Sequence, residues 1–141
     1  MNHVIIINGP NLNLTGSREP EIYGKQTLEE YFIGLQARFN FLAISTTQSN
    51  IEGEIINSIH AAGTDERCLG IVLNAGAYSH TSIAIADAVK AISKPVVLVH
   101  ISNIYAREPE RKTDLLVGSV KGMICGLGLH GYELALRSLL S

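Results

Sequence analysis

Residues 4–24 read VIIINGPNLNLTGSREPEIYG, and this stretch decides the fold. Its apolar beginning, residues 4–8, predicts a buried strand. The strand leads directly into a long loop rich in Gly, Pro and Asn, which also carries Arg18 and Tyr23. In an open parallel sheet, ligands bind beside the carboxyl ends of the strands, where a long loop is typical of a lid that closes on a substrate. Arg18 and Tyr23, on a lid at about residues 17–25, are therefore the first catalytic candidates.

Apolar segments alternate with helical patterns along the rest of the chain. Strands are predicted at residues 4–8, 42–48, 69–74, 95–100 and 122–125. Helices are predicted at residues 27–39 with Thr27 as N-cap, 52–62 with Gly63 as the terminating residue, 82–92 and 132–140. This alternation favours a parallel sheet with helices on both faces. Five strands in 141 residues predict one α/β domain over residues 1–141, flavodoxin-like and doubly wound.

Composition and charge exclude several classes of protein. The net charge is -2, from 11 basic and 13 acidic residues, so no basic field attracts nucleic acid or a membrane surface. Gly9 and Gly16 are too far apart for a GxGxxG nucleotide loop, and neither a P-loop lysine nor a GxSxG elbow is present. Cys68 and Cys125 lack the spacing of a metal or redox motif. We expect a cytoplasmic protein with two ordinary thiols and no targeting segment.

Polar side chains gather at the predicted carboxyl ends of the strands and in the loops after them. Each has an ordinary structural explanation: an asparagine can cap or turn the chain, a histidine at a strand end can be buried and structural, and arginines can be solvated surface charges. Their joint placement at one edge favours a site for a small polyhydroxylated acid. The candidates are Asn8, Asn11, Asn74, His80, His100, Ser102, Arg107 and Arg111.

Seven segments make the chain recognisable. They are NGPNLNL (8–14), REPEIYG (18–24), QSN (48–50), NAGAYSHTS (74–82), VHISN (99–103), ARE (106–108) and GLGLHGY (126–132). In this order and spacing they closely resemble the type II 3-dehydroquinate dehydratases from end to end. The resemblance implies an anti elimination of water from 3-dehydroquinate, through an enolate, to give 3-dehydroshikimate. It also implies that neither a Schiff base nor a cofactor is used, and that the protein forms a homododecamer built from trimers.

The resemblance also implies a role for each matching residue. Tyr23 is the base, and because an unperturbed tyrosine has a pKa of about 10, Arg18 is needed to favour its anion. His100 is the general acid that protonates the departing hydroxyl, and Asn11 holds the enolate or a water. The remaining matching positions bind substrate: Asn74, His80, Asp87 (which reaches a neighbouring subunit's site), the backbone amides of Ile101 and Ser102, and Arg111.

The chain departs from the family pattern around His100. Where the family usually has a glutamate two residues before this histidine, the chain has Leu98, and positions 98 and 100 of a strand face the same side. A carboxylate at position 98 would orient the imidazole and favour its protonated form, so His100 is either a weaker acid or needs another partner. In the next loop, Glu110 replaces a usual aromatic residue, and residues 112–114 (Lys-Thr-Asp) replace a basic, histidine and serine run.

These departures leave alternatives to an active dehydratase. One is a drifted, non-catalytic paralogue that binds quinate-like acids, and another is the same reaction in quinate breakdown rather than in aromatic biosynthesis. A generic flavodoxin-like binding or signalling module has less support, because the acidic cluster of a receiver domain is absent from the strand ends. If Leu98 does cost His100 its partner, turnover falls at a lower pH than in a relative with glutamate, and Leu98→Glu moves the alkaline limb upward.

Overall fold

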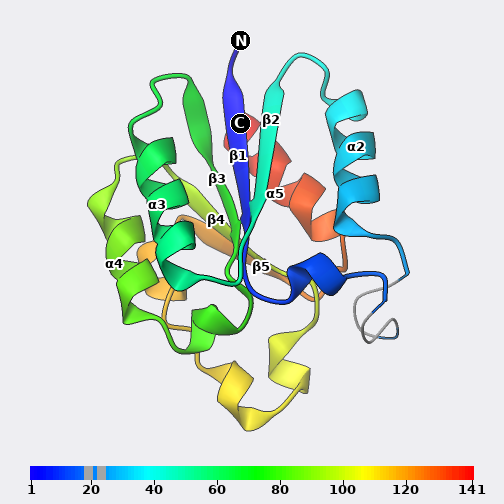
Figure 1. Ribbon diagram of the computed structural model, residues 1–141, viewed down its shortest axis with the longest axis vertical. Coiled ribbons are helices and arrows are strands. Elements are labelled where there is room, and N and C mark those ends of the chain that lie inside the picture. The colour runs from blue at the N-terminus through cyan, green and yellow to red at the C-terminus, as the bar shows by residue number, and fades with distance from the viewer. Residues whose placement is uncertain (18–20, 22–24) are drawn as a thin grey trace.

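The protein is built around one parallel sheet. The computed structural model describes residues 1–17, 21 and 25–141. Its five strands lie in the order β2-β1-β3-β4-β5, which confirms the predicted flavodoxin-like topology (Figure 1). Each observed strand agrees with its prediction to within one residue at either end. The strands are β1 (His3–Asn8), β2 (Ala43–Gln48), β3 (Cys68–Asn74), β4 (Val96–His100) and β5 (Gly122–Cys125).

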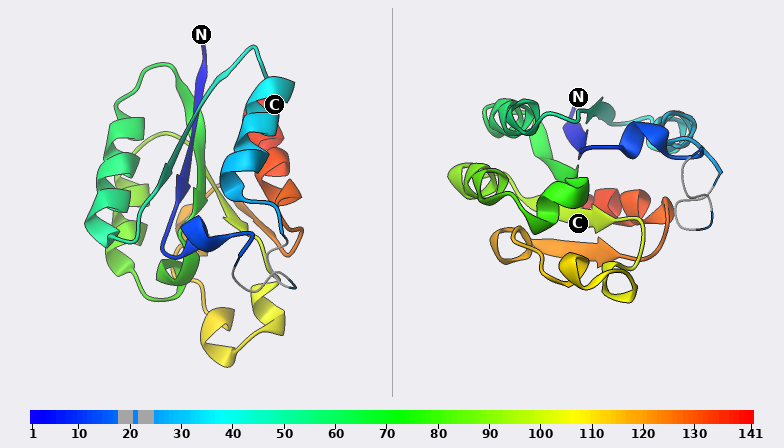
Figure 2. Two further views of the ribbon diagram at one scale, coloured as in Figure 1. Left: turned by 45° about the vertical axis from the view of Figure 1, so that its right-hand side comes forward. Right: turned by 60° about the horizontal axis from the view of Figure 1, so that its bottom comes forward.

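Helices cover both faces of the sheet, as predicted. Helices α2 (Leu28–Arg38) and α5 (His130–Leu140) lie on one face, and α3 (Glu52–Gly63) and α4 (Ile83–Ala91) lie on the other (Figures 1 and 2). Short 3-10 helices occupy several connections: η1 (Leu12–Leu14), η2 (Gly76–His80), η3 (Ile104–Ala106), η4 (Pro109–Lys112) and η5 (Val117–Ser119). Within the part of the chain that the structure describes, no helix is long and apolar enough to cross a membrane.

Strand side chains alternate between two separate cores. In β4, Val97 and Val99 pack in the core under α2 and α5, whereas Val96 and Leu98 pack in the core under α3 and α4. Because both faces are covered, the central strands are apolar nearly throughout. The same alternation puts His100 on the α3/α4 side of the sheet with Leu98.

Two helix ends differ from the predictions. Gly63 was expected to terminate α3 after residue 62, but it is the last helical residue and Thr64 is the C-cap. Its missing side chain serves packing instead, since a Cβ there would lie 2.4 Å from Ile92 Cγ2. Helix α5 begins at His130, two residues earlier than predicted. Gly131 lies in its first turn, where a Cβ would lie 3.3 Å from the side chains of Ile124 and Val99.

Other helix starts follow the sequence. Thr27 caps α2 as predicted, with its hydroxyl accepting the Glu30 N–H at 3.1 Å. Ser82 caps α4 in the same way through the Ile85 N–H, at 2.9 Å.

The loops after β1 and β3 touch at the point where the strand order reverses. The Gly9 N–H donates to the Asn74 carbonyl at 2.7 Å. A Cβ on Gly9 would lie only 2.4 Å from the Ala75 carbonyl oxygen, a backbone atom that has little room to move. Position 9 therefore has to be glycine for these two loops to meet.

We predict that Gly9→Ala lowers the free energy of unfolding by about 1–3 kcal/mol, because the new methyl group overpacks the contact with Ala75. Gly53, in the first turn of α3, has no other atom within 4 Å of a built Cβ. Gly53→Ala should therefore raise stability by about 0.5 kcal/mol. Urea denaturation at one protein concentration measures both variants. Equal free energies of unfolding for Gly9→Ala and Gly53→Ala would contradict the close approach of Gly9 to Ala75.

Candidate active site

A pocket opens at the carboxyl edge of the sheet. This edge lies at the bottom of Figure 1. The end of β3, the end of β4 and the 3-10 helices after them supply its walls. It thus lies beside the topological switch point, where ligands bind in this class of fold. The lining residues are Leu12, Asn74, Gly76, His80, His100, Ile101, Ser102, Ile104, Arg107 and Arg111.

The structure brings most of the predicted site residues into this pocket. Asn74 and Arg111, which are 37 positions apart in the chain, both line it because parallel strands and the loops after them meet at the same edge. The predicted residues that line it are Asn74, His80, His100, Ile101, Ser102, Arg107 and Arg111.

A buried hydrogen-bond chain fixes the floor of the site. The Tyr132 hydroxyl, on α5, donates to Asn8 Oδ1 at 2.6 Å and accepts from Asn74 Nδ2 at 2.8 Å. Asn8 Nδ2 continues the chain to the Thr47 carbonyl at 3.3 Å. Tyr132 is fully buried, and burial raises the pKa of its phenol, so it stays neutral. Sequence reasoning included Tyr132 in a motif but missed this role.

The amide of Asn74 is held at both ends. Its Oδ1 accepts the Gly76 N–H at 3.2 Å while its Nδ2 donates to Tyr132. Gly76 adopts a positive φ of 59°, which lets η2 start at once after β3. The side chain therefore faces the pocket in one fixed orientation.

His100 is buried at the end of β4 and is paired with a carboxylate. Its Nε2 lies 2.8 Å from Oδ2 of Asp114, and the two side chains are only 5% and 1% exposed. The other oxygen of Asp114, Oδ1, accepts the Leu116 N–H at 2.8 Å and the Val117 N–H at 3.2 Å. Leu98 implied that His100 is either a weaker acid or has another partner. The structure shows another partner, Asp114.

Burial opposes ionisation of Asp114, but hydrogen bonds from the His100 ring and the Leu116 amide outweigh it. Together with the charge of the imidazole, they hold the pKa of the Asp114 carboxyl below its usual value. The pair therefore presents an ionised carboxylate to the imidazole of His100 at neutral pH.

His80 lies over His100. The two rings are stacked with their centroids 6.0 Å apart and their planes inclined by 23°. His80 Nδ1 lies 2.7 Å from the Thr113 carbonyl, which can only accept, so this nitrogen carries the proton. The loop between η4 and η5 thus positions both histidines, through Thr113 and Asp114.

The turn after β4 is fixed by glycines. The carbonyls of His100 and Ile101 accept the Gly126 and Gly128 N–H groups, each at 3.0 Å. Both glycines have positive φ angles, 86° and 64°, which L side chains rarely adopt. This accounts for the GLG pattern directly after β5, which holds the backbone carbonyls of His100 and Ile101.

Two guanidinium groups line the pocket from the loop after β4. Arg107 Nη1 donates to Ser102 Oγ at 3.3 Å, and Arg111 Nε donates to Glu108 Oε2 at 3.0 Å. The hydrogen bond from Arg111 holds the pKa of the Glu108 carboxyl below its usual value. Guanidinium groups beside backbone amides suit an anionic ligand such as a carboxylate.

Among the predicted residues that the structure describes, three do not line this pocket: Asn8, Asn11 and Asp87. Asn11 is exposed and immediately precedes the lining residue Leu12. It has a positive φ of 67°, and its N–H donates to Asn50 Oδ1 at 3.0 Å. Asp87 is exposed on α4. Arg18 and Tyr23 lie outside the described residues, as does most of the predicted lid at residues 17–25.

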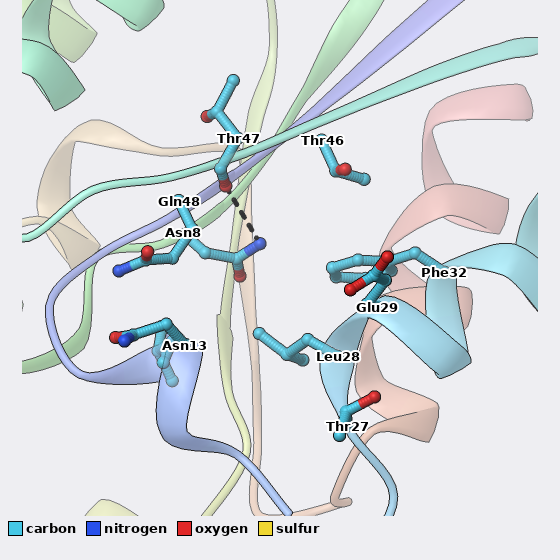
Figure 3. A pocket seen from close by; sticks show the side chains of 10 residues that line it. Asn8, Asn13, Thr27, Leu28, Glu29, Phe32, Thr46, Thr47 and Gln48 are labelled. Atoms are coloured by element: carbon cyan, nitrogen blue, oxygen red, sulfur yellow. Dashed lines mark hydrogen bonds between the residues drawn. The ribbon is translucent and has the colours of Figure 1, made fainter.

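A second hollow lies between the ends of β1 and β2 and the start of α2 (Figure 3). It shares Leu12 with the first pocket. Glu29 is the one charged side chain among its described lining residues, which otherwise supply amides, hydroxyls and apolar groups. None of its described lining residues is a histidine. Its other lining residues are Asn8, Asn13, Thr27, Leu28, Phe32, Thr46, Thr47 and Gln48. Across residues 1–17, 21 and 25–141, no group of three or more His, Cys, Asp or Glu could hold a metal ion.

The fold and the pocket together suit a small α/β enzyme, with a buried imidazole–carboxylate pair beside two guanidinium groups. Residues 2–140 match the family described as Dehydroquinase class II. The chain is 51% identical to 3-dehydroquinate dehydratase 1 of Agrobacterium fabrum, over 98% of this chain and 95% of that protein. It is 52% identical to 3-dehydroquinate dehydratase of Bacillus subtilis, over 100% and 95%.

Solved structures agree with the sequence relatives. The crystal structure of the type II dehydroquinase from Propionibacterium acnes superposes with a TM-score of 0.92 and is 41% identical, with 99% of this chain and 96% of that chain covered. The chain belongs to the class II dehydroquinase family. The resemblance inferred from seven segments of sequence is thereby confirmed.

We predict that Tyr132→Phe lowers the free energy of unfolding by about 2–3 kcal/mol, because Asn8 and Asn74 each lose a buried hydrogen-bond partner. Tyr105 is half exposed and does not line the pocket, so Tyr105→Phe is the matched control and should change stability by less than about 0.5 kcal/mol. Urea denaturation compares the two. Equal effects would mean that the Tyr132 hydroxyl does not hold the strand ends together.

Proposed function

We propose that the protein is a 3-dehydroquinate dehydratase, a hydro-lyase that removes water from 3-dehydroquinate to give 3-dehydroshikimate. The activity rests on the family and on relatives of that name that share about half of its residues over nearly the whole chain. The observation in the structure that carries the chemistry is the buried His100–Asp114 pair in a pocket with two guanidinium groups. Such a pair supports a general acid next to a bound carboxylate.

The proposed reaction needs a base and an acid on opposite sides of the substrate. Tyr23, as a tyrosinate favoured by Arg18, takes the proton next to the ketone, and the electron pair moves into an enolate. Asn11 stabilises the enolate oxygen directly or through a water. The enolate then collapses, the carbon–oxygen bond breaks, and His100 gives a proton to the departing hydroxyl to make water.

The remaining predicted residues are proposed to bind the substrate. Arg111 and the backbone amides of Ile101 and Ser102 take its carboxylate, and Asn74 and His80 take its hydroxyl groups. The fixed orientation of the Asn74 amide supports this role, because a pre-set donor or acceptor costs little entropy when the ligand binds.

Asp87 is proposed to act on a neighbouring subunit's site, within a homododecamer built from trimers. Its exposure on α4 supports this, as does exposed Ile83, which lies one helical turn away on the same side. A helix face with an apolar residue beside a carboxylate suits contact with a second copy of the chain. We further expect a cytoplasmic location, in keeping with the two free thiols.

The drifted, non-catalytic alternative is not favoured. Its main support was the loss of a carboxylate at position 98, and His100 has a carboxylate partner in Asp114. Whether the step serves aromatic biosynthesis or quinate breakdown depends on the enzymes that act beside it, because both routes use the same reaction.

The direct test mixes purified protein with 3-dehydroquinate and follows the ultraviolet absorbance of the conjugated enone in the product. The parent protein should give a rising signal. Tyr23→Phe should lower kcat by at least about 100-fold, because it removes the base. Tyr105→Phe is the control for loss of a tyrosine hydroxyl outside the pocket and should keep the parent rate.

A flat trace from folded parent protein would reject the dehydratase activity. Turnover of Tyr23→Phe close to that of the parent would leave the activity in place and reject Tyr23 as its base.

A further inference from the structure

We propose that Asp114 is the positioning residue of the general acid, and that it does from a loop what a carboxylate at position 98 would do from the strand. The inference rests on the proposed dehydratase activity, because it assigns a role in proton delivery by His100. It is carried by the contact of His100 Nε2 with Asp114 Oδ2 at 2.8 Å and by the near-complete burial of both side chains.

The geometry of Asp114 is that of a carboxylate locked in place. Oδ1 is held by the backbone amides of Leu116 and Val117, which leaves Oδ2 to the ring. Leu116 is fully buried in the core under α3 and α4, so it anchors the loop that carries the carboxylate. Three N–H donors on one buried side chain favour its ionised, acceptor-only form. Asp114 therefore requires a proton on His100 Nε2.

Leu98 shows why a loop residue is needed. It is fully buried in the same core as Leu116, on the same side of β4 as His100. As an apolar side chain, it gives the ring of His100 no hydrogen bond. Strand β4 therefore supplies no carboxylate to the ring of His100, and the carboxylate that contacts Nε2 comes from Asp114 in the loop.

The charges around His100 make this partner important. The His80 ring, on η2, stacks on the ring of His100. Arg107 and Arg111, in the loop after β4, line the same pocket, and Arg111 is hydrogen-bonded to Glu108. On β5, Cys125 lies opposite His100 in the strand register. Two guanidinium groups oppose a third positive charge in one pocket. The buried Asp114 carboxylate, 2.8 Å from the ring, places a negative charge directly against His100 in these surroundings.

Asp114 also determines which ring nitrogen acts. Because Nε2 faces the carboxylate, Nδ1 is the nitrogen left to give a proton to the departing hydroxyl. The ring then remains neutral, with its Nε2–H still donating to the Asp114 carboxylate. The proton on Nδ1 is replaced from solvent before the next turnover.

The test is Asp114→Asn, which keeps an oxygen for the amides of Leu116 and Val117 but removes the charge. We expect kcat to fall by at least about tenfold, with KM unchanged within about twofold, and the alkaline limb of kcat to move to lower pH. Glu110→Gln is the matched control, because it removes a carboxylate from the same loop that is exposed and does not line the pocket. It should keep the parent kcat and pH profile.

A second variant separates loss of the carboxylate from damage to the loop. Leu98→Glu, added to Asp114→Asn, places a carboxylate on the same side of β4 as His100. Recovery of kcat and of the alkaline limb in the double variant would support a positioning role. Loss of activity in Asp114→Asn with an unchanged pH profile and no recovery would overturn it.

Nitrogen-15 NMR of labelled histidines gives a readout that does not need turnover, since the chain has five. The parent should hold the Nε2–H form of His100, and Asp114→Asn should change the tautomer populations. An inactive parent with this signature would reject the dehydratase activity and keep the pairing. An unchanged tautomer and unchanged kcat in Asp114→Asn would reject the inference and keep the activity.

Discussion

The alternation of side chains along parallel strands is the constraint on which the site depends. All five strands end at one edge, so their last residues are gathered there, and the period of two then sorts them between the faces. Asn8 and Asn74 fall on the side of α5, where the buried Tyr132 hydroxyl joins them. His100 falls on the opposite side, with Leu98. The neutral hydrogen-bonded group of Asn8, Asn74 and Tyr132 thus lies on one side of the sheet, and the imidazole of His100 lies on the other.

The His100–Asp114 pair illustrates how a buried imidazole can keep its partner when the neighbouring strand position is apolar. A carboxylate needs only to reach one ring nitrogen with its remaining oxygen satisfied, and a loop anchored by Leu116 meets both needs. The strand position is then free to serve the hydrophobic core. Asp114 and Leu116, in one loop, thus connect the packing of the α3/α4 core to the chemistry of the pocket.

Much of the fold could be predicted, because strands buried on both faces are continuous apolar runs and helices carry caps such as Thr27. The places where prediction went wrong are glycines. Gly63 is the last helical residue of α3 and Gly131 lies inside α5, and in both cases a side chain from a distant element packs closely where a Cβ would be. A close approach between elements far apart in sequence leaves no local pattern to detect.

The sequence by itself determined the family, the strand order and the polar groups at the strand ends, because motifs and periodicity are local and survive without coordinates. Only the tertiary structure decided which of these groups touch. The sequence pointed two residues back from His100 for a carboxylate and found leucine, whereas the carboxylate comes from 14 residues ahead. A hydrogen bond forms between groups that are close in space. The packing of the loop that folds back over the sheet edge brings Asp114 close to His100, and the spacing of residues along the chain does not show that approach.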